Sequence, residues 1–282
     1  MDVVHGIEAL ESSHGRLFVV VGVFDGLHLG HRYLLEQLVA ESERQGARPT
    51  VITFDHHPDE VLTGAAPPLL MDPAERLERL AGSGVEVTVV QHFDAALRTT
   101  TYDAFVARLR ARVDLAGFLM TPDAAFGFER RGTPEALAAL GAERGFVVVV
   151  VPPFRLGDRA VSSTAIRSAI AAGDLARARA LVGRDIVLRA TVTGTGPDGA
   201  ATLGFPLPVA LPPEGAYPCA VDGAQALLRV VGHVVTLEPA PPTAQVVVEL
   251  SSGTTADGSL LGGAGPASGV HDGTKPATIR RS

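Results

Sequence analysis

The sequence predicts an α/β protein built on a five-stranded parallel sheet, followed by a small all-β domain. Between Arg16 and Arg184, apolar β-branched runs alternate with stretches of helical periodicity. This alternation is typical of parallel strands joined by helical crossovers. After Arg184 the helical periodicity ends, and short apolar runs are separated by proline and glycine clusters, as in an all-β unit.

Each of the five predicted strands is an apolar run without the polar alternation of a strand that faces water on one side. The runs are residues 16–23, 50–54, 85–90, 116–120 and 146–151. Helices are predicted between and after them, at residues 31–45, 72–81, 101–113, 133–144, 163–172 and 174–182. Asp72, Thr133 and Asp174 are candidate N-caps, and proline follows the first two, as is common at a helix start. Gly173 and Gly183 are expected to end the last two helices.

Three regions follow from these patterns: a domain at residues 1–184, a β domain at 185–250 and a tail at 251–282. Strands in the second region are predicted at residues 186–193, 217–221, 226–237 and 245–250. With about 65 residues, this unit lies near the lower limit for an independent core. The tail is rich in glycine, serine and threonine and carries too few apolar residues to fold, so we expect it to be disordered.

The composition excludes several classes of function. The formal net charge is −7, which disfavours sequence-independent nucleic-acid binding. The single lysine, Lys275, lies in the tail, so the folded part can hold neither a Walker-type lysine nor a Schiff base. Cys219 is the only cysteine, which excludes an intrachain disulfide and a thiolate metal cluster. With no apolar run of signal-peptide or membrane-spanning length, the expectation is a cytoplasmic protein without a membrane partner.

The first strand leads into a motif of glycines and histidines, Gly22-Val-Phe-Asp-Gly-Leu-His-Leu-Gly-His31. In an open parallel sheet, ligands bind beyond the carboxyl ends of the strands, where the strand order reverses. The glycines allow a sharp turn, and the free N–H groups of the next helix suit a polyphosphate. His28 and His31 are three residues apart, so both can face one point, and Gly30 leaves room for an α-phosphate. We expect this turn to stabilise charge that builds on phosphorus.

A second motif, Val161-Ser-Ser-Thr-Ala-Ile-Arg167, enters the penultimate helix. Ser162 or Ser163 caps that helix, and capping is one interpretation of the motif. Ser163, Thr164 and Arg167 also combine two hydroxyls, a helix N-terminus and a bidentate cation. Since the folded part lacks lysine, Arg167 is the natural cation for the β- and γ-phosphates of a nucleotide. Four other histidines show no ligand-spaced partner and are expected to be surface or capping residues: His14, His92, His233 and His271.

Together the two motifs resemble the adenylyltransferase module of the bacterial bifunctional riboflavin kinase/FMN adenylyltransferases, the prokaryotic FAD synthetases. More broadly, they are similar to the HxGH nucleotidyltransferases, which share a Rossmann-like sheet. The resemblance covers roughly residues 16–184. It includes Phe54-Asp-His-His-Pro58, similar to the family's FxxHP, and Asp123-Ala-Ala-Phe-Gly127, similar to its [DN]FxFG loop.

The resemblance implies transfer of AMP from ATP, with Mg²⁺, to the phosphate of FMN, giving FAD and pyrophosphate. It implies that His28 and His31 bind the transferring phosphate, and that Ser163, Thr164 and Arg167 bind the pyrophosphate. The residues implied to shape the nucleotide pocket are Gly22, Phe24, Asp25, Gly26 and Gly30. Those implied to border the flavin phosphate and ring are His57, Pro58, Asp123, Phe126 and Gly127.

Two departures from the family pattern leave alternatives open. In the loop after the fourth strand, Ala124 replaces the family's aromatic residue. The acceptor could therefore be a phosphorylated small molecule other than FMN, or the nucleotide could be CTP in place of ATP. A non-catalytic flavin- or nucleotide-binding regulator is a third hypothesis, which the complete set of phosphate-binding residues disfavours. In the β domain, the kinase motif GFPTAN is replaced by Gly204-Phe-Pro-Leu-Pro-Val209. Leu207 and Val209 cannot coordinate Mg²⁺, so we expect this domain to lack riboflavin kinase activity.

Overall fold

The structure is a computed structural model, and it describes residues 1–197, 199–251 and 277–279. Its larger sheet has the strand order β1-β4-β3-β2-β5-β6-β15, and the first six strands run parallel to their neighbours. From β2 the chain proceeds to β3 and β4 on one side and then returns to β5 on the other. The switch point therefore lies at the carboxyl ends of β2 and β5. The strands are β1 (Asp2–His5), β2 (Arg16–Val21), β3 (Arg48–Phe54), β4 (Val87–Gln91), β5 (Asp114–Met120), β6 (Val147–Val150) and β15 (Ala277–Ile279).

The parallel sheet has six strands rather than the five predicted, because β1 is also part of it. This strand is four residues long and only Val4 is buried, so it lacks the continuous apolar run that marks the others. The five predicted strands are confirmed with small shifts of their ends. Most of the tail predicted to be disordered lies outside the described residues, and its strand β15 pairs antiparallel with β6.

The predicted helices are confirmed with small shifts of their ends, and their predicted N-caps are in place. Asp72 accepts hydrogen bonds from the backbone of Ala74 and Glu75, and Thr133 and Asp174 cap their helices in the same way. Two short helices, α2 and α4, were not predicted, since each is shorter than two turns. The helices are α1 (Leu29–Gln45), α2 (Pro58–Thr63), α3 (Pro73–Ala81), α4 (Ala95–Thr99), α5 (Tyr102–Arg110), α6 (Pro134–Arg144), α7 (Ser163–Ala171) and α8 (Leu175–Val182). Shorter elements are the 3-10 turns Ile7–Ala9, Ser12–His14 and Phe128–Arg130 and the hairpin strands β7 (Arg155–Leu156) and β8 (Arg159–Ala160).

The C-terminal strands form a closed antiparallel barrel in the order β10-β13-β12-β11-β14-β9. The predicted strand at 226–237 is wrong as a single strand. It is a hairpin in which Val231 pairs with Val234, and Gly232, with a φ of 57°, makes the turn between them. The barrel strands are β9 (Ile186–Thr195), β10 (Ala201–Gly204), β11 (Gly215–Val221), β12 (Ala224–Val231), β13 (Val234–Glu238) and β14 (Gln245–Leu250).

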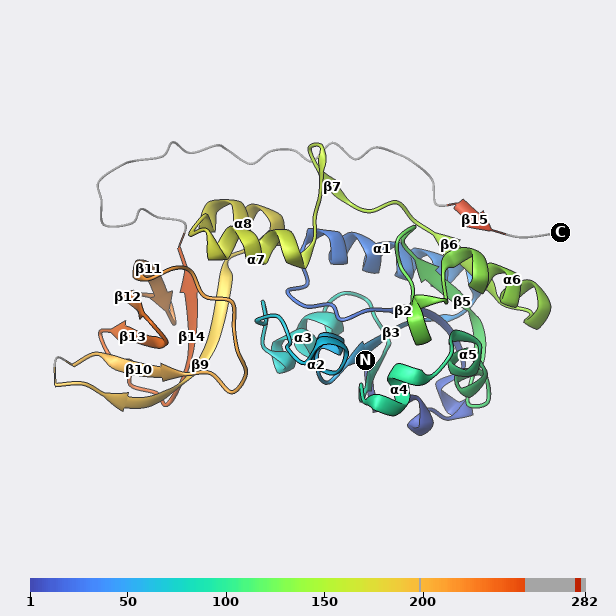
Figure 1. Cartoon of the computed structure of the whole chain (residues 1–282), viewed down its shortest axis with the longest axis horizontal. Helices are drawn as coiled ribbons and strands as arrows, with labels where there is room; N and C mark the ends of the chain where they lie inside the picture. Colours follow the sequence, from blue (N-terminus) through green and yellow to red (C-terminus); the bar gives the residue numbers. More distant parts are fainter. Residues whose placement is uncertain (198, 252–276, 280–282) are drawn as a thin grey trace.

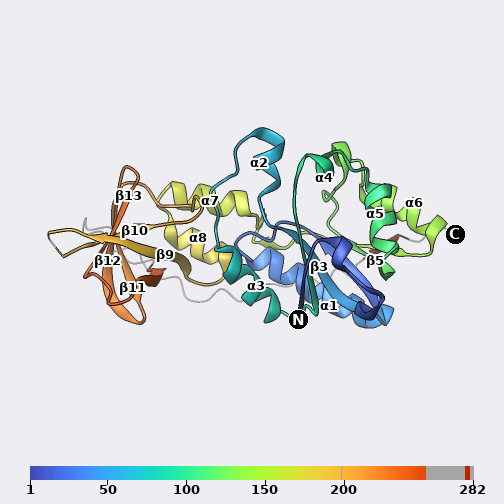
Figure 2. The same cartoon turned by 90° about the horizontal axis from the view of Figure 1, so that it is seen from below.

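Three apolar clusters hold these parts together. On one face of the sheet, β2 packs with α5 and α6, and on the other face it packs with α1 and α3. The third cluster joins α7 and α8 to the interior of the barrel. Figures 1 and 2 show these two helices between the sheet and the barrel. The small barrel therefore shares its core with the preceding helices. Among the described residues, no helix combines the length and the apolar character needed to cross a membrane.

Truncating the shared core should destabilise the barrel strongly. Leu228→Ala removes a fully buried side chain and should lower the free energy of unfolding by about 2–5 kcal/mol. Urea unfolding followed by far-UV circular dichroism measures the effect. Val231→Ala, on the same strand but 65% exposed, is the matched control and should leave the midpoint unchanged. Equal midpoints for both variants would contradict the shared core.

Candidate active site

A cleft of about 1120 Å³ opens at the carboxyl ends of the parallel strands. This volume lies slightly above the roughly 300–1,000 Å³ of a typical ligand pocket. Its walls come from the end of β2, the start of α1, the loop after β5 and the start of α7. Every predicted site residue except Gly26 lines this cleft. These residues are Gly22, Phe24, Asp25, His28, Gly30, His31, His57, Pro58, Asp123, Phe126, Gly127, Ser163, Thr164 and Arg167.

The turn between β2 and α1 is strained. Phe24 and Leu27 have positive φ angles of 56° and 36°, although both side chains are buried. Backbone strain of this kind costs about 1–3 kcal/mol per residue and persists only where the surroundings enforce it. Gly26, with a φ of 80°, makes the reversal between the two strained residues. Gly26 therefore shapes the turn from behind the cleft wall.

Two arginines, buried Arg76 and half-buried Arg184, hold the carbonyl groups of this turn. Arg76 on α3 donates to Val23 O at 3.0 Å and to Phe54 O at 2.7 Å, which ties the ends of β2 and β3 together. Arg184 donates to Gly26 O at 2.9 Å. Because the arginines donate to these carbonyl oxygens, the carbonyl dipoles repel an anion at the turn less strongly. Neither arginine was predicted as a site residue, since nothing local in the sequence shows that its side chain packs against a distant turn.

The two sequence motifs meet through an ion pair. Arg167 Nη2 lies 2.6 Å from Asp25 Oδ2, and Arg167 Nε donates to Pro68 O at 2.7 Å. The Asp25 carboxylate also accepts the Leu70 N–H at 3.0 Å, and Ser163 Oγ donates to Asp25 O at 3.1 Å. Burial raises the pKa of Asp25, whereas the Leu70 N–H and Arg167 oppose that shift. Asp25 therefore positions Arg167, and its carboxylate is already used inside the protein.

His28 and His31 stack at the bottom of the turn, with ring centroids 3.7 Å apart. His28 caps α1, because its Nδ1 accepts the His31 N–H at 3.2 Å. Burial, together with the charges of Arg184 and Arg167, lowers the pKa of His28 to about 4, and burial also lowers the pKa of His31. Both rings are thus neutral at pH 7. Since Nδ1 of His28 is an acceptor, its proton sits on Nε2, which is then a donor for a ligand oxygen.

The N-termini of α1 and α7 lie against each other at the cleft. A Cβ atom added to Gly30 would lie 3.1 Å from both the His28 ring and Val161 O, so a larger residue would have to push these neighbours apart. Ser162 is the N-cap of α7, accepting the Ala165 N–H at 3.2 Å. The first N–H groups of each helix have no partner within their own helix. Two positive helix ends therefore face one cleft.

The predicted acceptor-side residues lie on two loops of the same cleft. His57 caps α2 by accepting the Asp59 N–H at 3.2 Å, and Pro58 is the first residue of that helix. Burial lowers the pKa of His57. On the loop after β5, exposed Asp123 accepts a hydrogen bond from Thr121 Oγ1 at 2.8 Å.

Phe126 anchors the loop after β5 to the sheet. Its ring centroid lies 5.3 Å from Phe105 and 5.6 Å from Phe118. Gly127 follows with a φ of 77°, and a Cβ there would clash with the backbone of Tyr102. The loop is therefore fixed in place, with its aromatic side chain half-buried in the cleft wall.

The barrel reaches the site through one short segment. Leu69 N donates to Pro208 O, and Ala210 N donates to Leu69 O, each at 2.8 Å. The neighbours of Leu69 are Pro68 and Leu70, whose backbone groups hold Arg167 and Asp25. The segment that replaces the family's kinase motif thus supports the ion pair of the cleft. Sequence reasoning missed this contact because it joins distant parts of the chain.

The FAD synthetase family model matches residues 10–165. The chain belongs to the FAD synthetase family. The bifunctional riboflavin kinase/FMN adenylyltransferase of Escherichia coli K12 is 32% identical over 209 residues, which cover 73% of this chain and 66% of that protein. The Haemophilus influenzae enzyme of the same name is 32% identical, with 67% and 61% covered. The aligned part therefore spans less than two thirds of these relatives.

A solved structure shares the fold of this FAD synthetase family member. It is named as a macrolide-efflux protein from Streptococcus pneumoniae, with a TM-score of 0.73 and 23% identity. The match covers 89% of this chain and 90% of that one. At this level of sequence identity, the similarity shows that the two proteins share a fold.

Removing the charge of Asp25 should destabilise the protein. Asp25→Asn keeps the shape but leaves Arg167, whose side chain is 17% exposed, without its counter-ion. Breaking a buried pair in this way costs about 3–5 kcal/mol, which urea unfolding at neutral pH measures. Arg110→Gln, at an exposed position, is the control for loss of a charge. A stability of Asp25→Asn equal to that of the control would show that the pair contributes nothing.

The stability should also fall as the pH drops from about 7 to about 4. The unfolded chain protonates His28 near its ordinary pKa of 6.5, whereas the folded chain does so only near 4. The contribution of neutral His28 to the free energy of unfolding is complete above pH 6.5 and decreases by about 3 kcal/mol by pH 4. His28→Asn keeps a capping acceptor but does not titrate, so it should lose less stability by about that amount over the same window. Equal losses in urea titrations of both proteins would refute the assignment.

Proposed function

We propose that this protein transfers AMP from ATP to the phosphate of FMN, giving FAD and pyrophosphate, and that it lacks riboflavin kinase activity. The observation that carries the proposal is the meeting of two helix N-termini, a neutral histidine pair and a positioned arginine in one cleft. Membership of the FAD synthetase family supports the choice of ATP and FMN as substrates. The cleft volume supports simultaneous binding of both.

In this mechanism an oxygen of the FMN phosphate attacks the α-phosphorus of ATP in line. The new P–O bond forms as the bond to the β-phosphate oxygen breaks, and pyrophosphate leaves with those electrons. His28 Nε2–H and the neighbouring His31 hydrogen-bond the oxygens of the α-phosphate, where negative charge builds up. The protein forms no covalent intermediate, so catalysis rests on positioning and charge stabilisation.

The leaving pyrophosphate is bound by the start of α7. Arg167 uses Nε and Nη2 inside the protein, and its Nη1, which has no hydrogen-bond partner among the described residues, is left to donate to a phosphate oxygen. Ser163 already donates its hydroxyl proton to Asp25 O, so its backbone N–H at the helix start is its remaining donor. Thr164 is exposed at the cleft and offers a free hydroxyl.

Magnesium enters as the complex with ATP. Phosphate and water oxygens supply most of the ligands that Mg²⁺ requires. Asp25, the buried carboxylate of the turn, is paired with Arg167 and is not offered to a metal ion. The protein's part is therefore to bind the phosphates of the complex, and the ion neutralises charge on the pyrophosphate.

The flavin ring is proposed to bind between the loop after β5 and the start of α2. Leu62 and Phe128 line this part of the cleft although they are 46% and 38% exposed. Exposed apolar side chains at a cleft are typical of a surface that an aromatic ligand covers. His57 also lines the cleft and is proposed to donate to the FMN phosphate. Ala124, where the family has an aromatic residue, also lines the cleft and leaves room for a different acceptor.

The barrel residues that replace the kinase motif support the absence of kinase activity. Val209 forms a bridge with Leu69, and Leu207 is 39% exposed. Neither side chain can bind a phosphate or a metal ion. The segment has a structural contact with the adenylyltransferase site instead.

One set of assays tests the whole proposal. The purified full-length chain is incubated with Mg²⁺ and either ATP or CTP, together with FMN, riboflavin or another phosphorylated acceptor. Pyrophosphate release and chromatography of flavins are the readouts. We expect FAD only from ATP plus FMN and no FMN from riboflavin. FMN formation from riboflavin would overturn the absence of kinase activity, turnover with another pair would reassign the acceptor or nucleotide, and no turnover with any pair would favour a binding role.

Replacing either histidine should slow turnover more than it weakens nucleotide binding. His28→Ala and His31→Ala remove donors whose contacts strengthen as charge develops, so kcat should fall about a hundredfold with little change in the Kd for ATP. His233→Ala, at an exposed barrel position, is the matched control. Circular dichroism must confirm that each variant is folded. Equal losses in kcat and ATP affinity would contradict the assigned role.

A further inference from the structure

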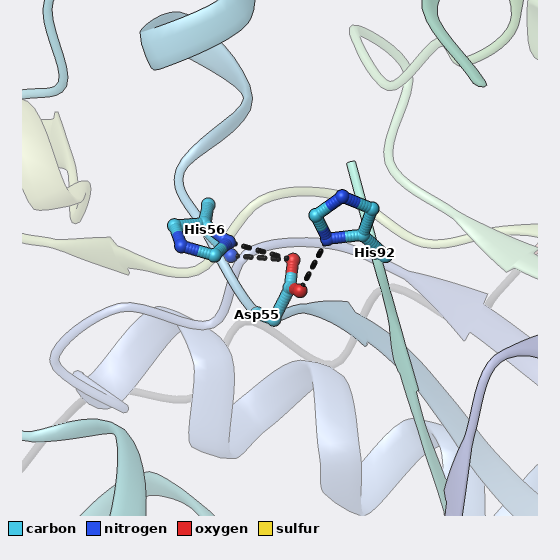
Figure 3. Close-up of side chains that lie close together, drawn as sticks. All are labelled: Asp55, His56 and His92. Atoms are coloured by element: carbon cyan, nitrogen blue, oxygen red, sulfur yellow. Dashed lines mark hydrogen bonds and ion pairs between the residues drawn. The ribbon is translucent and has the colours of Figure 1, made fainter. Parts of the chain in front are cut away.

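A second cluster of histidine and carboxylate side chains lies beside the cleft. Asp55 and His56 follow β3, and His92 follows β4. The two strands are parallel neighbours in which Phe54 pairs with Gln91, so their following residues emerge at the same edge. His92, expected from the sequence to be an isolated surface histidine, therefore has two partners. Figure 3 shows both imidazoles turned toward the carboxylate between them.

The three side chains are close enough to share one ion. His92 Nδ1 lies 2.6 Å from Asp55 Oδ2, and His56 Nδ1 lies 3.1 Å from Asp55 Oδ1. One potential ligand atom from each residue lies within 4.8 Å of the other two. Imidazole nitrogen and carboxylate oxygen bind zinc at about 2.0–2.2 Å, so an ion between them would draw the three side chains toward itself.

The carboxylate is held in place by the backbone of both loops. Asp55 Oδ1 accepts the His56 N–H at 2.8 Å and the Phe93 N–H at 3.3 Å, while Asp55 N donates to Gln91 O at 3.2 Å. Burial alone would raise the pKa of Asp55, but hydrogen bonds from His92 and His56 lower it. The carboxylate is thus ionised and oriented, whereas the exposed imidazoles can adjust. A fixed carboxylate with adjustable imidazoles is well suited to capture an ion.

We propose that Asp55, His56 and His92 bind one divalent transition-metal ion such as Zn²⁺. Two imidazoles and one carboxylate are ligands that favour zinc, nickel and related ions over Mg²⁺. With three protein ligands, water completes the coordination, as the 49% and 63% exposed side chains of His56 and His92 allow. Ligand binding requires both coordinating nitrogens to be unprotonated, so a proton on either is released when the ion binds.

This site is distinct from the proposed adenylyltransferase site. None of the three residues lines the cleft, but the next residue in each loop, His57 and Phe93, does. The ion would join the loop that starts α2 to the loop after β4. If His57 borders the acceptor, as the proposed function has it, the bound ion would fix this part of the cleft wall.

Metal titration of the full-length protein tests the proposal without relying on turnover. After treatment with a chelator, the protein is titrated with Zn²⁺ by calorimetry, and with Co²⁺ by visible absorption as a spectroscopic probe. We expect one saturable site with nitrogen and oxygen ligands. Mg²⁺ alone should give no comparable binding, and equal affinity for Mg²⁺ would overturn the assignment.

Variants of the exposed histidines identify the ligands. His56→Gln and His92→Gln should each weaken Zn²⁺ binding at least about tenfold. Replacing a residue that only hydrogen-bonds a metal ligand already lowers metal affinity by about that factor. His233→Gln, an exposed histidine of the barrel, should bind Zn²⁺ as the unmodified protein does. Thermal unfolding without metal establishes that each variant is folded. No saturable binding, or binding that both cluster variants leave unchanged, would overturn the proposal.

Discussion

The buried ion pair between Asp25 and Arg167 is the interaction on which the candidate site depends. It joins the turn after β2 to the start of α7, although the two residues are far apart in sequence. The same pair is held by the backbone of residues 68–70, which also contacts the barrel. Three parts of the chain therefore converge on one carboxylate. Because breaking a buried pair leaves an uncompensated charge, these parts are fixed together rather than merely adjacent.

The groups around this pair are arginines that stay charged and histidines that stay neutral. Arg76 is buried and Arg184 is half-buried, and burial lowers the pKa of Arg184 to about 10, so it stays charged at neutral pH. The charges of Arg184 and Arg167 help to keep His28 uncharged, since another cation in the same place would be repelled. A site of this kind binds an anion through fixed donors and needs no change in protonation to do so. That arrangement suits the reaction proposed here, in which charge moves across phosphate oxygens and no proton has to be transferred.

The barrel is best understood as part of the site's scaffold. Its core is continuous with α7 and α8, and Arg189 of β9 pairs with Glu78 of α3. The segment at 208–210, which overlaps the end of the motif at 204–209, pairs with Leu69, whose neighbours support Asp25 and Arg167. This segment therefore makes a structural contribution to the cleft.

The sequence by itself determined the order of strands and helices, the three N-caps and the two motifs, because apolar periodicity and capping depend on neighbours within a few residues. The Rossmann-like sheet could therefore be predicted from the sequence, and all the predicted site residues except Gly26 line the cleft. Only the tertiary structure decided which groups those residues contact. It added β1, which pairs with β4 although its short sequence has no continuous apolar run. It also brought Arg76 and Arg184 into contact with the turn after β2. It also placed His92 beside Asp55. Each of these depends on chain segments far apart in sequence, whose approach is set by packing of the whole sheet and leaves no local pattern.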